Sequence, residues 1–486
     1  MYKHITEQTA IFASVFKWVF LSAFVGLIIG GLITEFLNIL KYAEHYQTSL
    51  SFPYYYMLPF ALVFTVWIVK TFAPTASGHG TEKVIEAIHK NSGKIKLSVI
   101  PVKLTATVLT IFAGGSVGKE GPGAQIGAGM ASFLSDLFRF SNKDRRKFVI
   151  CGISAGFAAV FGTPIAGAIF GVEVLIIGVI MYDVLLPSFI AGFTAFTTAR
   201  FLGVTYTYYD VHFYHDVSLN LPLILKVVIA GLFFGLVANL MISTIREIER
   251  FIKRMNKKIN HYIVTFLGGL ILVGLTFLFS TRYLGLGFDT IQNCLYPDPY
   301  FSHGIPWYAF LLKTLFTSIT LGIGGSGGII TPVFYIGATS GHLFGQFAGD
   351  HITLFAALGF VSVLAGATNA PIASIIMAVE LFGLDIAHYA ALSAVIAFLI
   401  TGHRSVFPSQ ILAFRKSDLL DVEMGKEIEH THIKNSSFLS KLKPTKIQKR
   451  YKILSRWREN QRKKKDRRKE ERRKLKDRRK KNRRGL

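Results

Sequence analysis

Two glycine-rich stretches of this chain repeat each other at a fixed offset of 210 residues. Residues 103–128 read KLTATVLTIFAGGSVGKEGPGAQIGA, and residues 313–338 read KTLFTSITLGIGGSGGIITPVFYIGA. Eleven of the 26 aligned positions are identical, whereas average residue usage would give about two by chance. The chain is therefore built from two related halves, about 55–203 and 262–402. Glycine and proline interrupt both halves at matching places, which is typical of transporters that bind their substrate at broken helices.

The composition favours an all-α, polytopic membrane protein. Hydrophobic residues make up 51% of the chain, and the mean hydropathy is +0.41. Several apolar runs are shorter than the roughly 20 residues that a straight helix needs to cross a bilayer. Interrupted segments are tolerated at that depth only where protein or water satisfies their backbone groups, so we expect broken and re-entrant helices in two inverted-topology repeats. The runs lie near 10–36, 55–73, 104–113, 146–160, 164–182, 184–203, 222–243, 262–280, 308–323, 352–366, 371–383 and 388–402.

The positive charge is concentrated at the C-terminal end. Residues 441–486 hold 25 Lys and Arg against five Asp and Glu, which is +20 of the formal +26. We expect a membrane domain over 1–415 and a polar, basic and largely disordered tail over 416–486. Such a tail favours contact with anionic lipid, and it carries no stacking aromatics, so we expect no nucleic-acid partner. The excess of positive charge predicts that both termini are cytoplasmic, in a plasma (inner) membrane.

The two cysteines, Cys151 and Cys294, are too few for a disulfide framework. Cys151 lies in an apolar run, where a cysteine is usually a small core residue. We expect no metal site, no cofactor and no enzymatic activity. The polar chemistry is instead concentrated in the glycine-rich segments.

A glutamate flanked by glycines marks the first of these segments, Gly118–Pro122 (GKEGP). A carboxylate inside a membrane is costly, so Glu120 is a functional candidate. The N-termini of broken helices present free N–H groups and partial positive charge, which suit an anion. A charged Glu120 would compete with that anion, and a protonated one would withdraw. The alternative is a salt bridge from Glu120 to Lys119 or Lys103.

Four segments in order resemble the CLC family of chloride channels and proton-coupled chloride antiporters. GKEGP is similar to the family's GREGP segment, whose glutamate is the gate, and GIITP at 328–332 resembles the GIFxP segment. GHGT at 78–81 resembles the GSGIP segment, and RSVFPSQ at 404–410 resembles the segment that carries the central tyrosine. The resemblance covers about residues 10–415.

The resemblance implies a homodimer with one anion pathway inside each subunit. The anion, chloride or a similar one, would be held by backbone N–H groups of helices that begin near 79, 119, 329 and 407. Protons are possible partners in the antiporter members. Glu120 would be the gate, and the anion-binding positions would be His79, Gly80, Lys119, Gly121, Gly328, Ile329, Ile330 and Phe407.

The departures from the family pattern bear on how tightly an anion is held. His79 stands at the serine position of GSGIP, where an imidazole donates one hydrogen bond when neutral and adds a full charge when protonated. The alternative is that His79 caps a helix without contacting the anion. Phe407 stands at the tyrosine position and has no hydroxyl to donate. Losing one donor in a desolvated site typically costs about 1–3 kcal/mol.

A third departure bears on proton coupling. Many antiporters of the family carry two successive glutamates where this chain has Glu173 and then Val174, and valine carries no proton. Glu173 recurs as Glu380 in the second half, so a shared packing or capping role is expected. Lys103 likewise recurs as Lys313. Each lysine either pairs with a glutamate or raises the potential beside the anion path.

These observations predict chloride transport through a CLC-type pathway gated by Glu120, with channel-like flux. The alternative within the family is a proton-coupled chloride antiporter. Discontinuous glycine-containing helices also serve secondary transporters of other anions or solutes, which is the competing class. Against that class, the glycine-rich segments hold no conspicuous cluster of Asn, Asp and Ser that would form a cation site.

Overall fold

The computed structural model describes residues 2–206, 221–296, 304–349, 351–431 and 433–434. Most of the basic tail predicted over 416–486 therefore lies outside the described residues. The chain divides into two compact units, Met1–Lys416 with Met424–Thr431, and Ser417–Glu423 with His432–Leu486. Within the described part of the second unit, β3 (Asp421–Val422) pairs antiparallel with β4 (Ile433–Lys434).

The first unit is made almost entirely of helices, as predicted. Among the described residues, five stretches are long and apolar enough to cross a membrane, namely Thr6–Thr48, Tyr54–Phe72, Tyr182–Phe201, Leu221–Asn256 and His261–Leu278. The α-helices are α1 (Tyr2–Thr48), α2 (Leu58–Phe72), α3 (Gly80–Lys90), α4 (Val99–Phe112), α5 (Glu120–Leu137), α6 (Asn142–Phe161), α7 (Pro164–Glu173), α8 (Tyr182–Phe201), α9 (Leu221–Asn256), α10 (His261–Leu278), α11 (Phe288–Leu295), α12 (Ala309–Gly322), α13 (Ile330–Ala348), α14 (Ile352–Thr368), α15 (Pro371–Phe382) and α16 (Ala387–Ile400). Single 3₁₀ turns lie at Tyr54–Met57, Pro74–Ala76, Thr281–Tyr283, Leu384–Ile386 and Ile428–His430.

The sequence repeat is also a structural repeat. Helices α4 and α12 begin 210 residues apart, and so do α5 and α13. In each half the glycine-rich segment separates a short apolar helix from the next helix, so each half contains the break that the glycines predict. Helix α5 packs on α6, and α13 packs on α14 in the same way.

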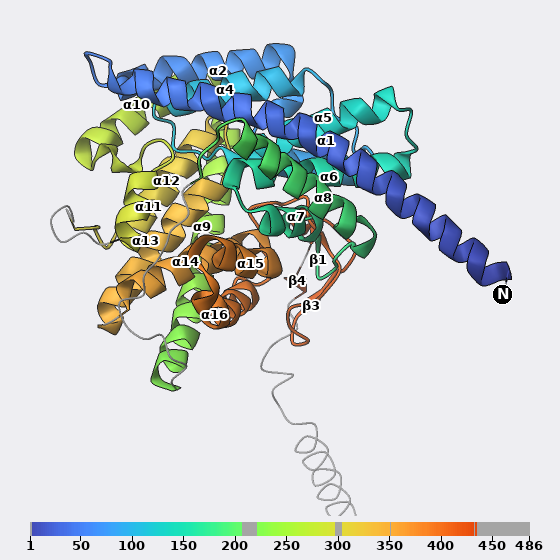
Figure 1. The fold of residues 1–486 in the computed structure, drawn as a ribbon. Coiled ribbons are helices and arrows are strands. Elements are labelled where there is room, and N and C mark those ends of the chain that lie inside the picture. The colour runs from blue at the N-terminus through green and yellow to red at the C-terminus, as the bar shows by residue number, and fades with distance from the viewer. Residues whose placement is uncertain (1, 207–220, 297–303, 350, 432, 435–486) are drawn as a thin grey trace, which may run out of the picture. The chain divides into compact units, whose positions relative to one another are not determined.

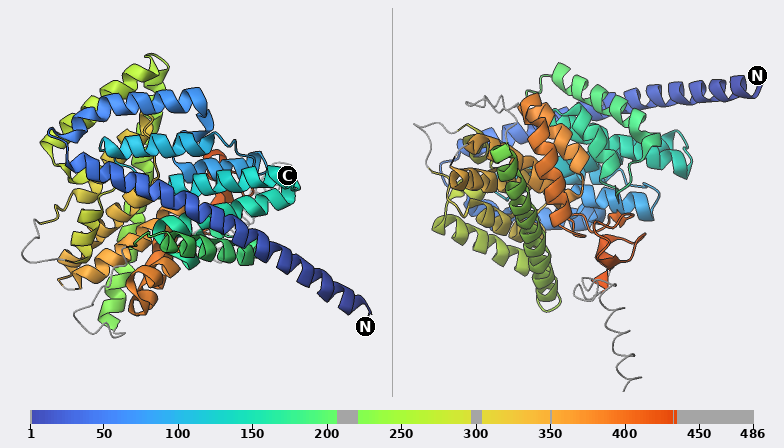
Figure 2. Two further views of the ribbon diagram at one scale, coloured as in Figure 1. Left: turned by 45° about the horizontal axis from the view of Figure 1, so that its top comes forward. Right: turned by 90° about the horizontal axis from the view of Figure 1, so that it is seen from below.

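Two long helices lie against the two halves. Helix α1 runs across α5, α6 and α8 of the first half (Figure 1). Helix α9 packs along α12, α14 and α16 of the second half (Figure 2). The largest core cluster includes buried side chains from both halves, among them Phe157, Phe170, Phe334 and Phe360. The breaks of the two halves therefore lie inside a packed protein interior.

The helix predicted to begin near 407 is absent, and this prediction was wrong. Residues 407–410 form a turn, and β2 (Ile411–Leu412) follows and pairs in parallel with β1 (Ile176–Ile177). Pro408 disfavours the α conformation at the residue before it. The Phe407 N–H donates to the Ser405 hydroxyl, and the Pro408 carbonyl accepts from the N–H of Glu429. The backbone groups of this segment are thus taken by other segments instead of by a helix of its own.

Candidate anion pathway

The breaks in the two halves meet at a pair of glycines. Gly118 and Gly328 form an antiparallel bridge, in which the Gly118 N–H donates to the Gly328 carbonyl at 2.7 Å and the reverse bond measures 2.6 Å. Two residues further along each chain segment, α5 begins at Glu120 and α13 begins at Ile330. The N-termini of these two helices therefore point towards one shared region, as antiparallel repeats require.

A third helix N-terminus joins them through contacts that only glycine permits. A Cβ atom on Gly80 would lie 2.2 Å from the Gly121 carbonyl oxygen, and one on Gly121 would lie 2.9 Å from the Gly328 Cα. His79, the residue before α3, forms a parallel bridge with Gly327. The first turns of α3, α5 and α13 thus converge. Together they supply unsatisfied N–H groups and partial positive charge, which attract an anion.

Glu120 occupies the N-terminus of α13. Its side chain is fully buried, and Oε2 accepts from the Thr331 N–H at 3.1 Å and from the Thr331 hydroxyl at 2.5 Å. Its other oxygen, Oε1, is buried and has no hydrogen-bond partner among the described residues. The carboxylate therefore sits where an anion would bind, with one oxygen held and one free.

Thr331 is a candidate site residue that the sequence analysis missed, because it holds the Glu120 carboxylate. It lies at the variable position of GIITP, so no motif singles it out. The signal was available in the repeat, because Thr331 aligns with Gly121 in the first half and is the one position in the first turn of α13 with a side-chain donor.

Lys119 precedes Glu120 in the chain, and no ion pair joins the two side chains in the described structure. Within the described residues Glu120 has no ion pair with Lys119 or Lys103, so the salt-bridge alternative is wrong. The Lys119 ammonium instead lies 5.1 Å from the ring centre of Phe288, at the start of α11. Lys119, Phe288 and Glu44 line a cavity of about 280 Å³, which brings solvent-accessible space to the residue before the carboxylate.

The two repeated lysines hold loops. Both are fully buried. Lys103 donates to the carbonyls of Ala76 and Gly78 at 3.2 and 2.6 Å, in the loop before α3. Lys313 donates to the carbonyls of Tyr283 and Gly285 at 3.2 and 2.8 Å, in the loop before α11. Neither meets a glutamate in the described structure, so the pairing alternative is wrong, and their effect on the local potential stays a prediction.

Glu173 and Glu380 cap each other's helices, which confirms the capping role. Glu173 accepts from the N–H groups of Ile372 and Ala373 at 3.1 and 2.8 Å, at the start of α15. Glu380 accepts from Ile165 and Ala166 at 3.0 and 2.8 Å, at the start of α7. Each carboxylate satisfies N–H groups that a helix start leaves free, and the pair ties α7 to α15.

His79 occupies the residue before α3, yet its side chain makes no capping hydrogen bond, so it is not a cap. It is 8% exposed, and Nδ1 is buried without a partner among the described residues. Its Nε2 lies 3.7 Å from Oε1 of Glu249, near the end of α9. The imidazole is thus part of the region where the helix starts converge, and a carboxylate faces one of its nitrogens.

The turn at Phe407 reaches the same region through Ser409. The Ser409 N–H and hydroxyl donate to Oε1 of Glu82 at 3.1 and 2.5 Å, and Glu82 lies in the first turn of α3. Phe407 itself is fully buried. The structure therefore places its turn beside α3, although no helix dipole accompanies it.

The remaining predicted positions differ in what they can offer an anion. Ile329 and Ile330 are buried at the start of α13, where their backbone, not their side chains, could contact a ligand. The Gly328 N–H is already taken by the Gly118 carbonyl. In this conformation Gly328 therefore contributes a close backbone contact instead of a free donor.

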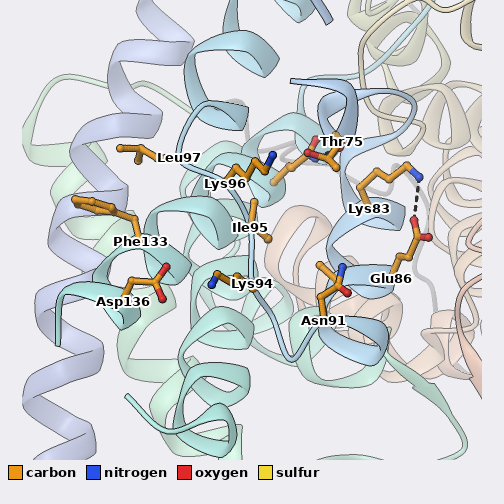
Figure 3. A pocket seen from close by; sticks show the side chains of 12 residues that line it. Thr75, Lys83, Glu86, Asn91, Lys94, Ile95, Lys96, Leu97, Phe133 and Asp136 are labelled. Carbon is orange, nitrogen blue, oxygen red and sulfur yellow. Dashed lines mark hydrogen bonds and ion pairs between the residues drawn. The ribbon is translucent and has the colours of Figure 1, made fainter. Parts of the chain in front are cut away.

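A second, larger cavity lies beside α3 and contains none of the predicted anion-binding residues. It measures about 780 Å³ and is lined by side chains of α3, the loop after it and α5, including Lys83, Glu86, Lys94 and Asp136 (Figure 3). Lys83 and Glu86 form an ion pair at 2.8 Å, and this hydrogen bond holds the pKa of the Glu86 carboxyl below its usual range. The lining of this cavity therefore includes none of the residues predicted to bind the anion.

Known proteins resemble this chain over most of its length. The family model described as voltage gated chloride channel matches residues 60–402. A chloride/fluoride channel protein of Pseudomonas syringae pv. tomato is 35% identical over 419 residues, which cover 84% of this chain and 90% of that protein. A solved CLC-type fluoride/proton antiporter is 31% identical with a TM-score of 0.76, covering 82% of this chain and 98% of that one. A slow cyanobacterial Cl−/H+ antiporter, 20% identical with a TM-score of 0.68 over 79% and 94% of the two chains, shares the fold.

Proposed function

This chain belongs to the CLC family of voltage gated chloride channels and carries anions across a membrane, and we propose that it exchanges fluoride for protons. The observation that carries this proposal is the Glu120 carboxylate, buried at the N-terminus of α13 with one oxygen held by Thr331 and the other without a partner. A titratable group in the position of the anion is what an exchanger of anions and protons needs.

The exchange follows from competition for the donors of Thr331. The charged carboxylate accepts from the Thr331 N–H and hydroxyl, so it excludes an anion from them. Protonation removes the charge, and hydrogen bonds to charged acceptors are about twice as strong as those to neutral ones. A protonated Glu120 therefore yields the Thr331 donors to an anion. Glu120 then loses its proton before its carboxylate binds those donors again. Each cycle would move a proton and an anion through the same place in turn.

Fluoride is supported by the relatives and by a free hydroxyl in the pathway. The antiporter that is 31% identical is described as a fluoride/proton antiporter, and the 35% identical relative as a chloride/fluoride channel protein. The Thr81 hydroxyl, in the first turn of α3, is buried and has no partner among the described residues. A small anion with a high charge density gains most from such a hydroxyl donor.

A chloride-conducting, channel-like pathway is the second candidate, because two positions favour it. Val174 is fully buried at the position of the family's second glutamate, so no carboxylate there relays a proton. Phe407 offers no hydroxyl in the turn beside α3, which weakens the hold on an anion. In this case Glu120 would gate the flux without being coupled to proton movement.

We also propose the setting of the protein in the membrane. The homodimer follows from membership of the family. The positive tail favours cytoplasmic termini in the plasma (inner) membrane and contact with anionic lipid.

The test is flux from proteoliposomes, read with a fluoride-selective electrode and an internal pH probe. Under an outward fluoride gradient the protein should release fluoride and drive protons inward against a proton gradient. Glu120→Gln, which cannot release a proton, should abolish the proton movement. Glu86→Gln is the matched control, since Glu86 lines the separate cavity beside α3, and it should exchange like the unmodified protein.

The two candidate functions give different results in this assay. Anion release without proton movement in the unmodified protein would contradict exchange and favour the channel. Chloride release that exceeds fluoride release would overturn the fluoride assignment. If proton-coupled flux persisted in Glu120→Gln, Glu120 would not be the group that carries the proton.

A further inference from the structure

The imidazole of His79 has two unequal nitrogens. Its Nε2 lies 3.7 Å from the Glu249 carboxylate, and its Nδ1 is buried with no partner among the described residues. The backbone next to it contacts Gly327, one residue from the Gly118–Gly328 bridge, so the ring belongs to the converging helix starts. The side chain of His79 is 10% exposed and that of Glu249 is 31% exposed. Solvent therefore reaches the pair from the side of Glu249.

The charges around this pair are mixed, and no other described carboxylate contacts His79. Glu82 shares the first turn of α3, but its Oε1 is held by Ser409. Lys253 lies 3.8 Å from Glu249 and is largely exposed. Other charged groups on the elements packed around this region are Lys103 of α4, Glu120 of α5, Arg246 of α9 and Arg404 before the Phe407 turn.

The position of Glu249 decides which nitrogen of neutral His79 carries hydrogen. A neutral imidazole has one N–H, and a neighbouring carboxylate favours that hydrogen on the nitrogen facing it. With the hydrogen on Nε2, neutral His79 presents a lone pair at Nδ1, which repels an anion. A ring that keeps its hydrogen on Nε2 can donate from Nδ1 only after it takes up a second proton.

We infer that an anion at the α3 end of the pathway is bound by His79 only together with a proton, and that the facing Glu249 carboxylate imposes this requirement by favouring the hydrogen of the neutral ring on Nε2. The proton comes from solvent and forms the Nδ1–H bond as the anion arrives; it returns to solvent when the anion leaves. The inference rests on the proposed function, because it presumes an anion at the helix starts. It gives the pathway a second proton-binding side chain besides Glu120, on a chain that has Val174 in place of a relay carboxylate.

The test uses a background in which Glu120 cannot bind or release a proton. Purified Glu120→Gln protein is titrated calorimetrically with sodium fluoride, and then with sodium chloride, in buffers of different ionisation enthalpy. About one proton should be taken up per anion, and the affinity should fall about tenfold per pH unit over the pH range in which that uptake is measured, as one linked proton requires. Adding His388→Gln, which replaces an exposed histidine in the first turn of α16, should leave the proton uptake unchanged.

Two further substitutions separate the roles of the pair. Adding His79→Gln should abolish the proton uptake, because the neutral glutamine amide donates a hydrogen bond to the anion without first binding a proton. Adding Glu249→Gln should also abolish it while binding persists, since an amide at 249 can donate to Nε2 and leave the hydrogen of neutral His79 on Nδ1. Because Glu249 is partly exposed, this variant tests the inference even where His79→Gln fails to fold.

The outcomes distinguish this inference from the proposed function. Unchanged proton uptake in Glu249→Gln, or in folded His79→Gln, would overturn the inference. If these variants still bind the anion, the proposed function would stand. If neither the unmodified protein nor Glu120→Gln bound fluoride or chloride, and neither carried them in vesicles, the proposed function would fail and the inference with it.

Discussion

Replacing Thr331 by valine should release the gate. Valine keeps the shape of threonine but lacks the hydroxyl, so Glu120 keeps only the Thr331 N–H at 3.1 Å. A hydrogen bond to a charged group contributes about 1.5–3 kcal/mol. The charged carboxylate therefore loses that much in its held position, but an anion that takes the same donors loses the hydroxyl as well, so its affinity should change less than about tenfold. Calorimetric titration with fluoride measures this change.

The same loss moves the pH dependence of flux in a defined direction. Removing a donor destabilises the charged carboxylate and leaves the protonated form nearly untouched, so Glu120 becomes protonated at higher pH. The midpoint of acid-activated flux should rise by about one to two pH units, because one unit corresponds to 1.36 kcal/mol. Thr331→Ser keeps the hydroxyl and should behave like the unmodified protein. If valine and serine at 331 gave the same affinity and the same midpoint, the hydroxyl would not hold the gate.

Two further perturbations address positions outside the gate. Phe407→Tyr should tighten anion binding by about 1–3 kcal/mol, because it restores a buried hydroxyl donor beside α3; calorimetry that shows no change would place the pathway away from this turn. Glu173→Ala should lower the free energy of unfolding by about 2 kcal/mol, because it removes the acceptor of two N–H groups at a buried helix start. Glu380→Ala should lower the free energy of unfolding by less, because its N–H partners are more exposed. Thermal unfolding in detergent measures both, with Glu86→Ala expected within about 0.5 kcal/mol of the unmodified protein.

The sequence predicts well those features that depend on local pattern and on the internal repeat. Glycines at breaks in apolar runs predict where helices begin, and α3, α5 and α13 begin within one residue of the expected positions. The capping role of Glu173 and Glu380 was predictable because the repeat carries the same acid at the same place. Residues related by the repeat share a scaffold, so their common role is structural.

The features that the sequence does not predict depend on contacts between distant segments. The turn at Phe407 forms because residues as far away as Glu82 and Glu429 take its backbone groups, and no local pattern encodes such partners. Thr331 and Glu249 were missed for the same reason. Each acts on a residue of the first half, Glu120 or His79, and only the folded chain brings them together.

The repeat also explains why only one half carries the proposed gate. Lys103 and Lys313 hold equivalent loops, so the scaffold is nearly the same in both halves. At the helix starts the residue types differ: the offset of 210 aligns Glu120 with Ile330 and Gly121 with Thr331. One half therefore supplies the carboxylate and the other supplies the donors that hold it. Two identical halves would place either two carboxylates or none at the meeting point, and like charges that close repel one another. The difference between the halves, within a shared backbone, is what places a single carboxylate at the meeting point.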